Sequence, residues 1–194
     1  MFNKAAIFTL MLITTVLSGC APSYQKPVKD VNLVEVSYDA VETLLKQLSQ
    51  PIPKGSLIIV STLVNVDDLN QTSAFGRIVS DQLASAFHNS GYRIKGMEMQ
   101  TALFVKEENG MLHFSDETKE TLAKLNASAL VAGVFAAGKR TAYVSLRIVD
   151  INSKNIISST DYAVPMGPDA KALLKPKNTG DAKPEIDVNG LNSD

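Results

Sequence analysis

A single cysteine, Cys20, is the residue of this 194-residue chain best placed for covalent chemistry. It follows two small residues, Ser18 and Gly19, and before them an apolar run from Ala5 to Val16 that only threonines interrupt. The run is too short to span a bilayer, which takes about 20 apolar residues, but its length suits the hydrophobic region of a secretory signal. We therefore expect an exported chain with one thiol that no second cysteine can pair.

The order Leu17-Ser18-Gly19-Cys20 resembles the lipobox of bacterial lipoproteins. In that family the cysteine sulfur is acylated and the leader is removed, so that the cysteine becomes residue one. The resemblance implies a signal peptide over residues 1–19 and a covalent lipid such as palmitate on Cys20, with no other cofactor. Two or three acyl chains would hold the protein on a membrane durably, since one chain binds only marginally. An ordinary cleaved signal that happens to contain a cysteine is the alternative.

Other residues that can carry chemistry do not form catalytic or ligating patterns. His88 and His113 are the only histidines, and neither has a metal-ligand partner at short spacing. Asp67 and Asp68 lack the glycine-centred acidic continuation of a calcium loop. The sequence also has no Gly-x-Ser-x-Gly elbow and no glycine-rich phosphate loop. We expect no catalytic residue, no metal site and no enzyme activity, with an unrecognised active site as the alternative.

Length and charge narrow the possible functions further. Cleavage before Cys20 would leave 175 residues, enough for one domain with a substantial core. The chain has 19 basic and 20 acidic residues, and Lys4 is the only charged residue in the leader, so the mature net charge is −2. This balance gives no electrostatic reason to expect binding to nucleic acid or to an anionic membrane surface.

The first half of the mature chain shows strand and helix periodicity in alternation. A strand, a helix and a short strand in succession are typical of a parallel βαβ unit. The predicted segments are an extended linker over 21–32, a helix over 38–48 capped by Ser37 or Asp39, a strand over 57–66, a helix that Ser73 caps and that ends near Asn89, and a strand over 92–94.

The second half predicts a hairpin, a third helix and three closing strands. Asn109-Gly110 is a strong hairpin turn signal, and the strand that begins at Thr141 alternates as a half-buried antiparallel strand does. The predicted segments are a hairpin over 103–114, a helix over 116–125, strands over 129–135, 141–150 and 156–164, and a disordered tail over 167–194.

Together these segments predict an α/β fold with α+β character in a single domain over residues 37–166. We expect a mixed sheet of about five to seven strands, about three helices, and an antiparallel meander at the C-terminal end, with the last strand at an edge. Residues 20–36 would be the lipidated cysteine and its linker.

Three stretches within this domain resemble the FlgO-type family of flagellar outer-membrane proteins. They are the strand and loop over 63–70, the helix start Ser73-Ala74-Phe75-Gly76-Arg77, and the strand entry Gly91-Tyr92-Arg93. The resemblance implies a non-enzymatic outer-membrane lipoprotein that faces the periplasm. It would act as a tethered adaptor in flagellar assembly or stability, and so in motility, with flagellar basal-body or other envelope proteins as partners. Ala21 in place of an aspartate resembles outer-membrane sorting in a Gram-negative host.

Two surfaces are candidates for contact with such a partner. One is the loop and helix start with Asp67, Asp68, Phe75 and Arg77, where Arg77 bonds either its own loop or the partner. The other is the predicted edge strand over 156–164, whose unpaired backbone could accept a partner strand. The sequence does not indicate the oligomeric state.

Two alternative functions stay open. One is a lipoprotein regulator of peptidoglycan synthesis, similar to the activators of penicillin-binding proteins. The other is a subunit of a curli-type secretion complex. The first would need a linker that crosses the periplasm, and residues 20–32 extend at most ~45 Å.

Overall fold

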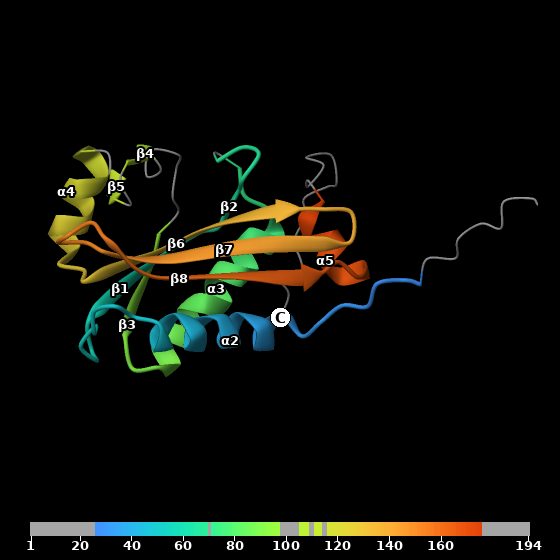
Figure 1. Ribbon diagram of the computed structural model, residues 1–194, viewed down its shortest axis with the longest axis horizontal. Coiled ribbons are helices and arrows are strands. Elements are labelled where there is room, and N and C mark those ends of the chain that lie inside the picture. The colour runs from blue at the N-terminus through green and yellow to red at the C-terminus, as the bar shows by residue number, and fades with distance from the viewer. Residues whose placement is uncertain (1–25, 70, 98–104, 109–110, 114–115, 176–194) are drawn as a thin grey trace, which may run out of the picture.

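The computed structural model describes residues 26–69, 71–97, 105–108, 111–113 and 116–175 (Figure 1). These residues form a mixed sheet with helices on both of its faces, which confirms the predicted α/β class. In chain order the elements are α2 (Leu33–Lys46), β1 (Leu57–Ser61), β2 (Val64–Asn65), α3 (Ala74–Asn89), β3 (Arg93–Met97), β4 (Val105–Glu108), β5 (Met111–His113), α4 (Asp116–Leu125), β6 (Ala129–Ala137), β7 (Thr141–Asp150), β8 (Ile156–Pro165) and α5 (Pro168–Leu174).

The main sheet has the strand order β3-β1-β6-β7-β8, and β2 also pairs with β6. β1 lies parallel to both β3 and β6, whereas β7 and β8 are antiparallel to their neighbours. The unit β1-α3-β3 is the predicted βαβ unit, and β6-β7-β8 is the predicted meander with its last strand at an edge. β4 and β5 form a separate antiparallel hairpin.

The main core lies between the sheet and α2, α3 and α5. Ile58 and Val60 of β1 point into this core, while Ile59 between them joins a smaller cluster under Leu122 of α4 on the opposite face. In β7, Ala142 is buried and its neighbour Tyr143 is 59% exposed, as the predicted alternation requires. None of the described helices combines the length and the apolar composition that a membrane-spanning segment needs.

The first helix begins five residues earlier than predicted. Its N-cap is Asn32, whose side chain accepts a hydrogen bond from the Glu35 N–H at 3.3 Å. Ser37, a predicted cap, is instead buried inside the helix, where its hydroxyl lies 2.8 Å from the Leu33 carbonyl oxygen. Residues 33–36 therefore belong to the domain and not to the linker.

The segment after β8 is helical where the sequence predicts the start of a disordered tail. Pro168 opens α5 at a position where the missing N–H costs nothing. Gly167 has no side chain to cap the helix, and Asp30 replaces it by accepting hydrogen bonds from the Asp169 and Ala170 N–H groups, both at 3.0 Å. The rest of the predicted tail, residues 176–194, lies outside the described residues, as do the signal peptide, Cys20 and the Asn109-Gly110 turn.

Candidate functional site

A break between β1 and β2 positions the candidate partner loop. Val60 pairs with Val131 and Val64 pairs with Val134, so this side of the ladder holds one residue more than β6 does. This is a β-bulge. The Leu63 N–H donates to Ser80 Oγ at 2.8 Å, and the Leu63 carbonyl accepts from Thr72 Oγ1 at 2.6 Å. Side chains of α3 and its preceding loop thus satisfy the backbone that leaves the sheet.

The loop after β2 is held by its own backbone. The Asn65 N–H donates to the Gln71 carbonyl at 2.8 Å, and the Gln71 N–H donates to the Asp68 carbonyl at 2.9 Å. The Asn65 side chain also accepts from the Asp67 N–H at 3.1 Å. As a result, Asp67 is exposed on a closed loop, whereas Asp68 is half-buried and makes a further contact.

The start of α3 packs tightly on the sheet. Ser73 caps the helix by accepting from the Gly76 N–H at 3.2 Å, as predicted. A Cβ on Gly76 would lie 2.5 Å from the Leu63 carbonyl oxygen, so only glycine fits there. Phe75 is fully buried and meets Phe135 edge-to-face at 5.6 Å. Its assignment to the partner surface was therefore wrong, because no partner can reach its side chain.

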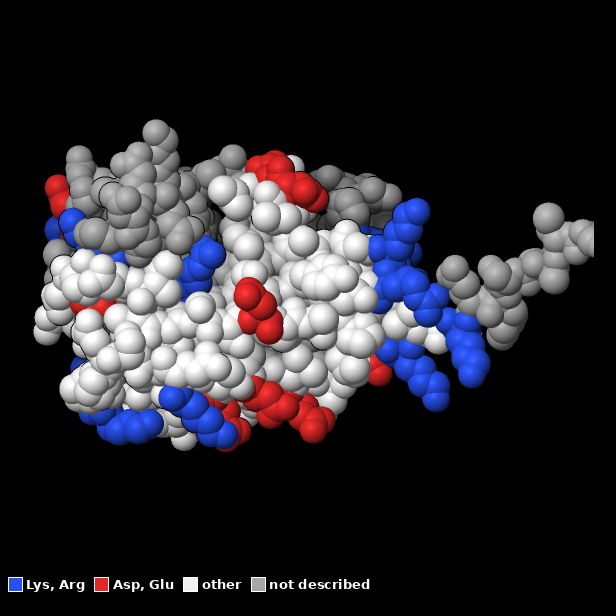
Figure 2. All heavy atoms as spheres, in the orientation of Figure 1, with Lys and Arg blue, Asp and Glu red and all other residues white. Residues whose placement is uncertain are grey.

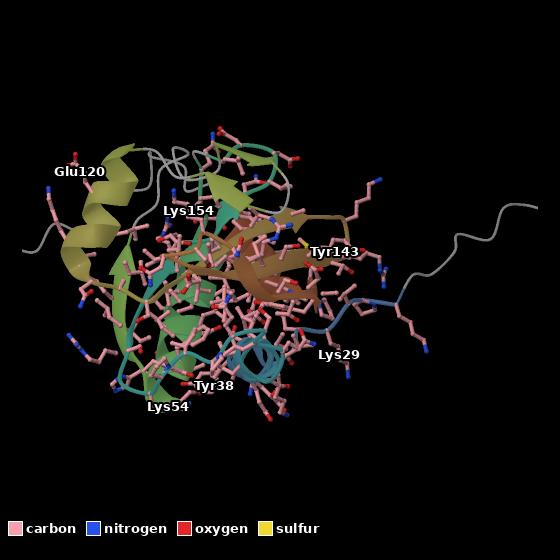
Figure 3. The ribbon with its side chains drawn as sticks, turned by 60° about the vertical axis from the view of Figure 1, so that its left-hand side comes forward. Lys29, Tyr38, Lys54, Glu120, Tyr143 and Lys154 are labelled. Atoms are coloured by element: carbon pink, nitrogen blue, oxygen red, sulfur yellow. The ribbon has the colours of Figure 1, made fainter. Side chains whose placement is uncertain are left out.

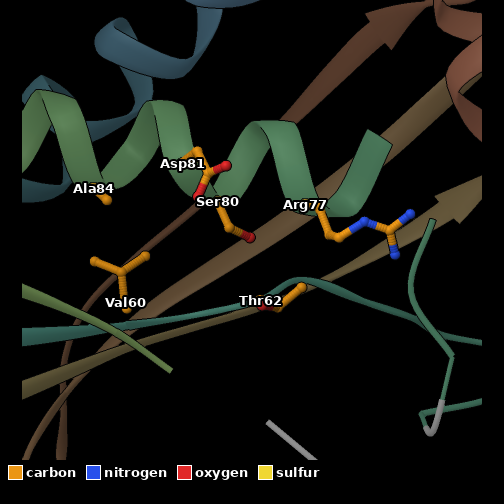
Figure 4. Close-up of a pocket in the computed structure, with 7 residues that line it drawn as sticks. Val60, Thr62, Arg77, Ser80, Asp81 and Ala84 are labelled. Carbon is orange, nitrogen blue, oxygen red and sulfur yellow. The ribbon is translucent and has the colours of Figure 1, made fainter. Parts of the chain in front are cut away.

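Arg77 is exposed and lies at the rim of a pocket of about 350 Å³. In Figure 4 its side chain points along α3 toward the loop that follows β2, and Asp81 lies one helical turn further on. Within the described residues, no ion pair joins Arg77 to Asp67. The pocket lies between α3 and the carboxyl ends of β1 and β3, and is lined by Val60, Thr62, Arg77, Ser80, Asp81, Ala84 and Gly96.

The structure thus brings Asp67 and Arg77 to one end of the sheet as exposed charges. The sequence did not indicate the pocket beside them, because its lining comes from three separate elements. Searched over the described residues alone, the chain contains no group of three His, Cys, Asp or Glu side chains that could hold a metal ion.

The edge of β8 is the second candidate surface. In an antiparallel strand the N–H and C=O of one residue point to the same side, and successive residues alternate. The Met166 N–H bonds the Arg140 carbonyl at the β7 side. By alternation, Ser159, Asp161 and Ala163 direct their backbone groups away from β7. The Ser49 N–H closes the beginning of this edge by bonding the Ile157 carbonyl at 2.8 Å.

Comparison with known proteins identifies one family. The model of the family described as FlgO protein matches residues 38–169, which is more than half of the chain. No curated protein sequence matches.

Three solved structures are similar in fold. The LpoB C-terminal domain from Salmonella enterica is 14% identical with a TM-score of 0.49, covering 70% of this chain and 100% of that one. The PelC dodecamer from Paraburkholderia phytofirmans is 12% identical with a TM-score of 0.41, covering 60% and 75%. Lipoprotein GNA1162 from Neisseria meningitidis is 18% identical with a TM-score of 0.38, covering 65% and 86%.

Proposed function

The chain belongs to the FlgO protein family, and we propose that it is a non-enzymatic, lipid-anchored adaptor that supports flagellar assembly or stability at the outer membrane. The family match over residues 38–169 is the observation that carries this proposal. The exposed Asp67 and Arg77 support a binding function, because they extend from an ordered loop and helix start without taking part in the core.

The anchor would be a lipid on Cys20 in the periplasmic leaflet of the outer membrane. A tether confines the domain to a surface and raises its effective concentration for a partner on the same surface. A weak protein contact is then sufficient for a stable complex, which suits a contact surface made of exposed polar groups.

The partner contact would centre on the loop after β2 and the first turn of α3. Asp67 presents a carboxylate and Arg77 a guanidinium, so the complementary surface on the partner would carry both signs of charge. The free edge of β8 from Ser159 onward offers a second contact, through backbone hydrogen bonds to an added strand.

A regulator of peptidoglycan synthesis is the rival function, and the structure shortens its reach. Residues 26–32 pack against the domain through Lys26 and Asp30, so they do not extend as a linker. Only the chain from Cys20 to Lys26 is left to span the distance, and it extends at most ~20 Å. This length favours a partner close to the membrane.

Swimming in soft agar tests the proposal, with beta-lactam sensitivity and growth rate measured in parallel. A deletion strain should swim poorly at normal growth, and the wild-type chain should restore swimming. Arg77→Ala and Asp67→Asn should restore it only in part, while Arg93→Ala, an exposed arginine on β3, should restore it fully. Normal swimming with altered beta-lactam sensitivity would contradict the proposal and favour the cell-wall regulator.

A further inference from the structure

One end of the domain concentrates positive charge. Figure 2 shows Lys and Arg side chains gathered at the end where the N-terminal segment leaves the domain. All of these side chains are exposed, and they come from the N-terminal segment, the β6–β7 turn and α5. We call this surface the basic end, and it consists of Lys26, Lys29, Lys139, Arg140 and Lys171.

Hydrogen bonds hold the three segments of the basic end together. Arg140 Nη2 donates to the Lys26 carbonyl oxygen at 3.1 Å. Asp30 accepts from the first N–H groups of α5, which brings Lys29 and Lys171 to the same end. These bonds, the first of them to Ala170, hold the pKa of Asp30 below its ordinary value, so this carboxylate stays charged. The cations are therefore displayed in a fixed arrangement.

The charge at this end differs in sign from that of the whole chain. Asp30 and Asp169 are the acidic residues among the segments that build it, so the basic end carries a net +3. The mature chain carries −2. Of the five cations, Arg140 is engaged with Lys26 and makes a further contact, which leaves the four lysines as the mobile charges for a ligand.

We propose that the basic end binds the anionic phospholipid headgroups of the membrane in which the lipid is inserted, and thereby orients the domain. This inference rests on the proposed lipid anchor at Cys20. Five residues, 21–25, separate Cys20 from Lys26, so the anchor holds Lys26 within ~20 Å of the bilayer. Each Lys near an anionic surface favours the bound state by about fivefold, and this attraction decays over a Debye length of about 8 Å.

The bound orientation places the β6–β7 turn at the membrane and the β7–β8 turn away from it. Figure 3 shows Lys29 and Tyr143 toward the basic end, and Glu120 and Lys154 toward the opposite end. The strand β7 spans ten residues between the two turns, or roughly 30 Å. The chain has no tryptophan, so one introduced at either end is a unique fluorescent reporter of height above the bilayer.

The test uses the acylated full-length protein in vesicles that contain phosphatidylglycerol and a trace of dansyl-labelled headgroup lipid. Energy transfer to dansyl is compared for Tyr143→Trp and for Ser153→Trp, an exposed residue in the β7–β8 turn. We expect several-fold more transfer from position 143. The difference should shrink in pure phosphatidylcholine, in 0.5 M salt, and in the triple variant K26Q/K29Q/K139Q.

The matched control is K46Q/K95Q/K124Q, which removes the same charge from exposed lysines outside the basic end and should keep the difference. Equal transfer from both positions, or a difference that neutral lipid and the first triple variant leave unchanged, would overturn the inference. Mass spectrometry of the same sample separates the two proposals. Chain without acyl groups on Cys20 refutes the anchor, whereas acylated chain with equal transfer refutes only the basic end as a membrane-binding surface.

Discussion

The guanidinium of Arg140 donates a hydrogen bond to the main-chain oxygen of Lys26, which lies 114 residues earlier in the sequence. This contact fixes where the N-terminal segment leaves the domain, because it joins that segment to the turn between β6 and β7. The tether and the basic end therefore share one end of the molecule. That coincidence connects the proposed anchor to the orientation of the partner surface.

Asp30→Ala should loosen α5 without unfolding the domain. The Asp169 and Ala170 N–H groups would lose their acceptor, and their hydrogen exchange should become faster while exchange within β7 stays unchanged. The pKa of Asp30 is lowered, so its stabilising effect is present above the ordinary Asp range and is lost as acid pH falls through the lowered value. Slow exchange at both amides in the variant, or no loss of protection in acid, would contradict this role.

Ser80→Ala should lower the free energy of unfolding by about 1–3 kcal/mol. The substitution leaves the buried Leu63 N–H at the bulge without a partner, and an unsatisfied buried donor costs about that much. Urea unfolding followed by circular dichroism measures the change. Ser85→Ala on the same helix is the control, because Ser85 is exposed and bonds only the Asp81 carbonyl at 2.9 Å. Equal effects at both positions would show that the bulge is not held by Ser80.

Gly76→Ala should destabilise the domain by about 1–3 kcal/mol, the usual cost of overpacking. Alanine favours a helix by about 1 kcal/mol over glycine, but a Cβ here would lie 2.5 Å from both the Leu63 carbonyl oxygen and Thr72 Oγ1. Gly96→Ala is the matched control, since nothing lies within 4 Å of its added Cβ. Thermal unfolding of both variants decides the point, and a stabilised Gly76→Ala protein would refute the packing argument.

Tyr162→Phe should leave the protein at least as stable, by up to about 1 kcal/mol. The Tyr162 hydroxyl is shielded from solvent and makes no hydrogen bond in the described part of the chain. Ser37 lies close enough to lower the pKa slightly, but its hydroxyl is bonded to Leu33 and Gln82.

The alkaline limb gives this prediction its sign. Burial raises the pKa of Tyr162 from 10.0 to about 12. The unfolded chain therefore ionises first, and wild-type stability is complete below pH 10 and falls as the pH rises toward 12. The Phe variant lacks this contribution, so urea unfolding of the two proteins at pH 9 and pH 11 should show their difference widening. Parallel curves at both pH values would contradict the burial argument.

Local signals in the sequence predicted most of the fold. The alternation in β7 and the Ser73 cap before α3 depend on neighbouring residues, and both were confirmed. The early start of α2 also had a local signal that was overlooked. Asn32 followed by Glu35 has the spacing of a capping box, but Ser37 interrupts the apolar stripe and directed attention to a later start.

The features that the sequence did not reveal depend on distant pairings. The net charge of −2 argued against an anionic surface as a ligand, yet Lys26 and Arg140 come together only through the fold. The pocket beside Arg77 likewise needs β1, β3 and α3 in place. Phe75 was assigned to the partner surface because a motif does not state which of its residues face the core.

The most direct test of the tethered-adaptor account is swimming by a strain whose only copy is non-lipidated but still exported. In that chain an ordinary cleavable leader replaces residues 1–19, and Cys20→Ala removes the acylation site. Periplasmic abundance is matched to wild type by immunoblot, and soft-agar spreading is compared with the deletion strain and with wild type. The account predicts spreading close to that of the deletion strain. Wild-type spreading by this soluble form would contradict the need for a tether.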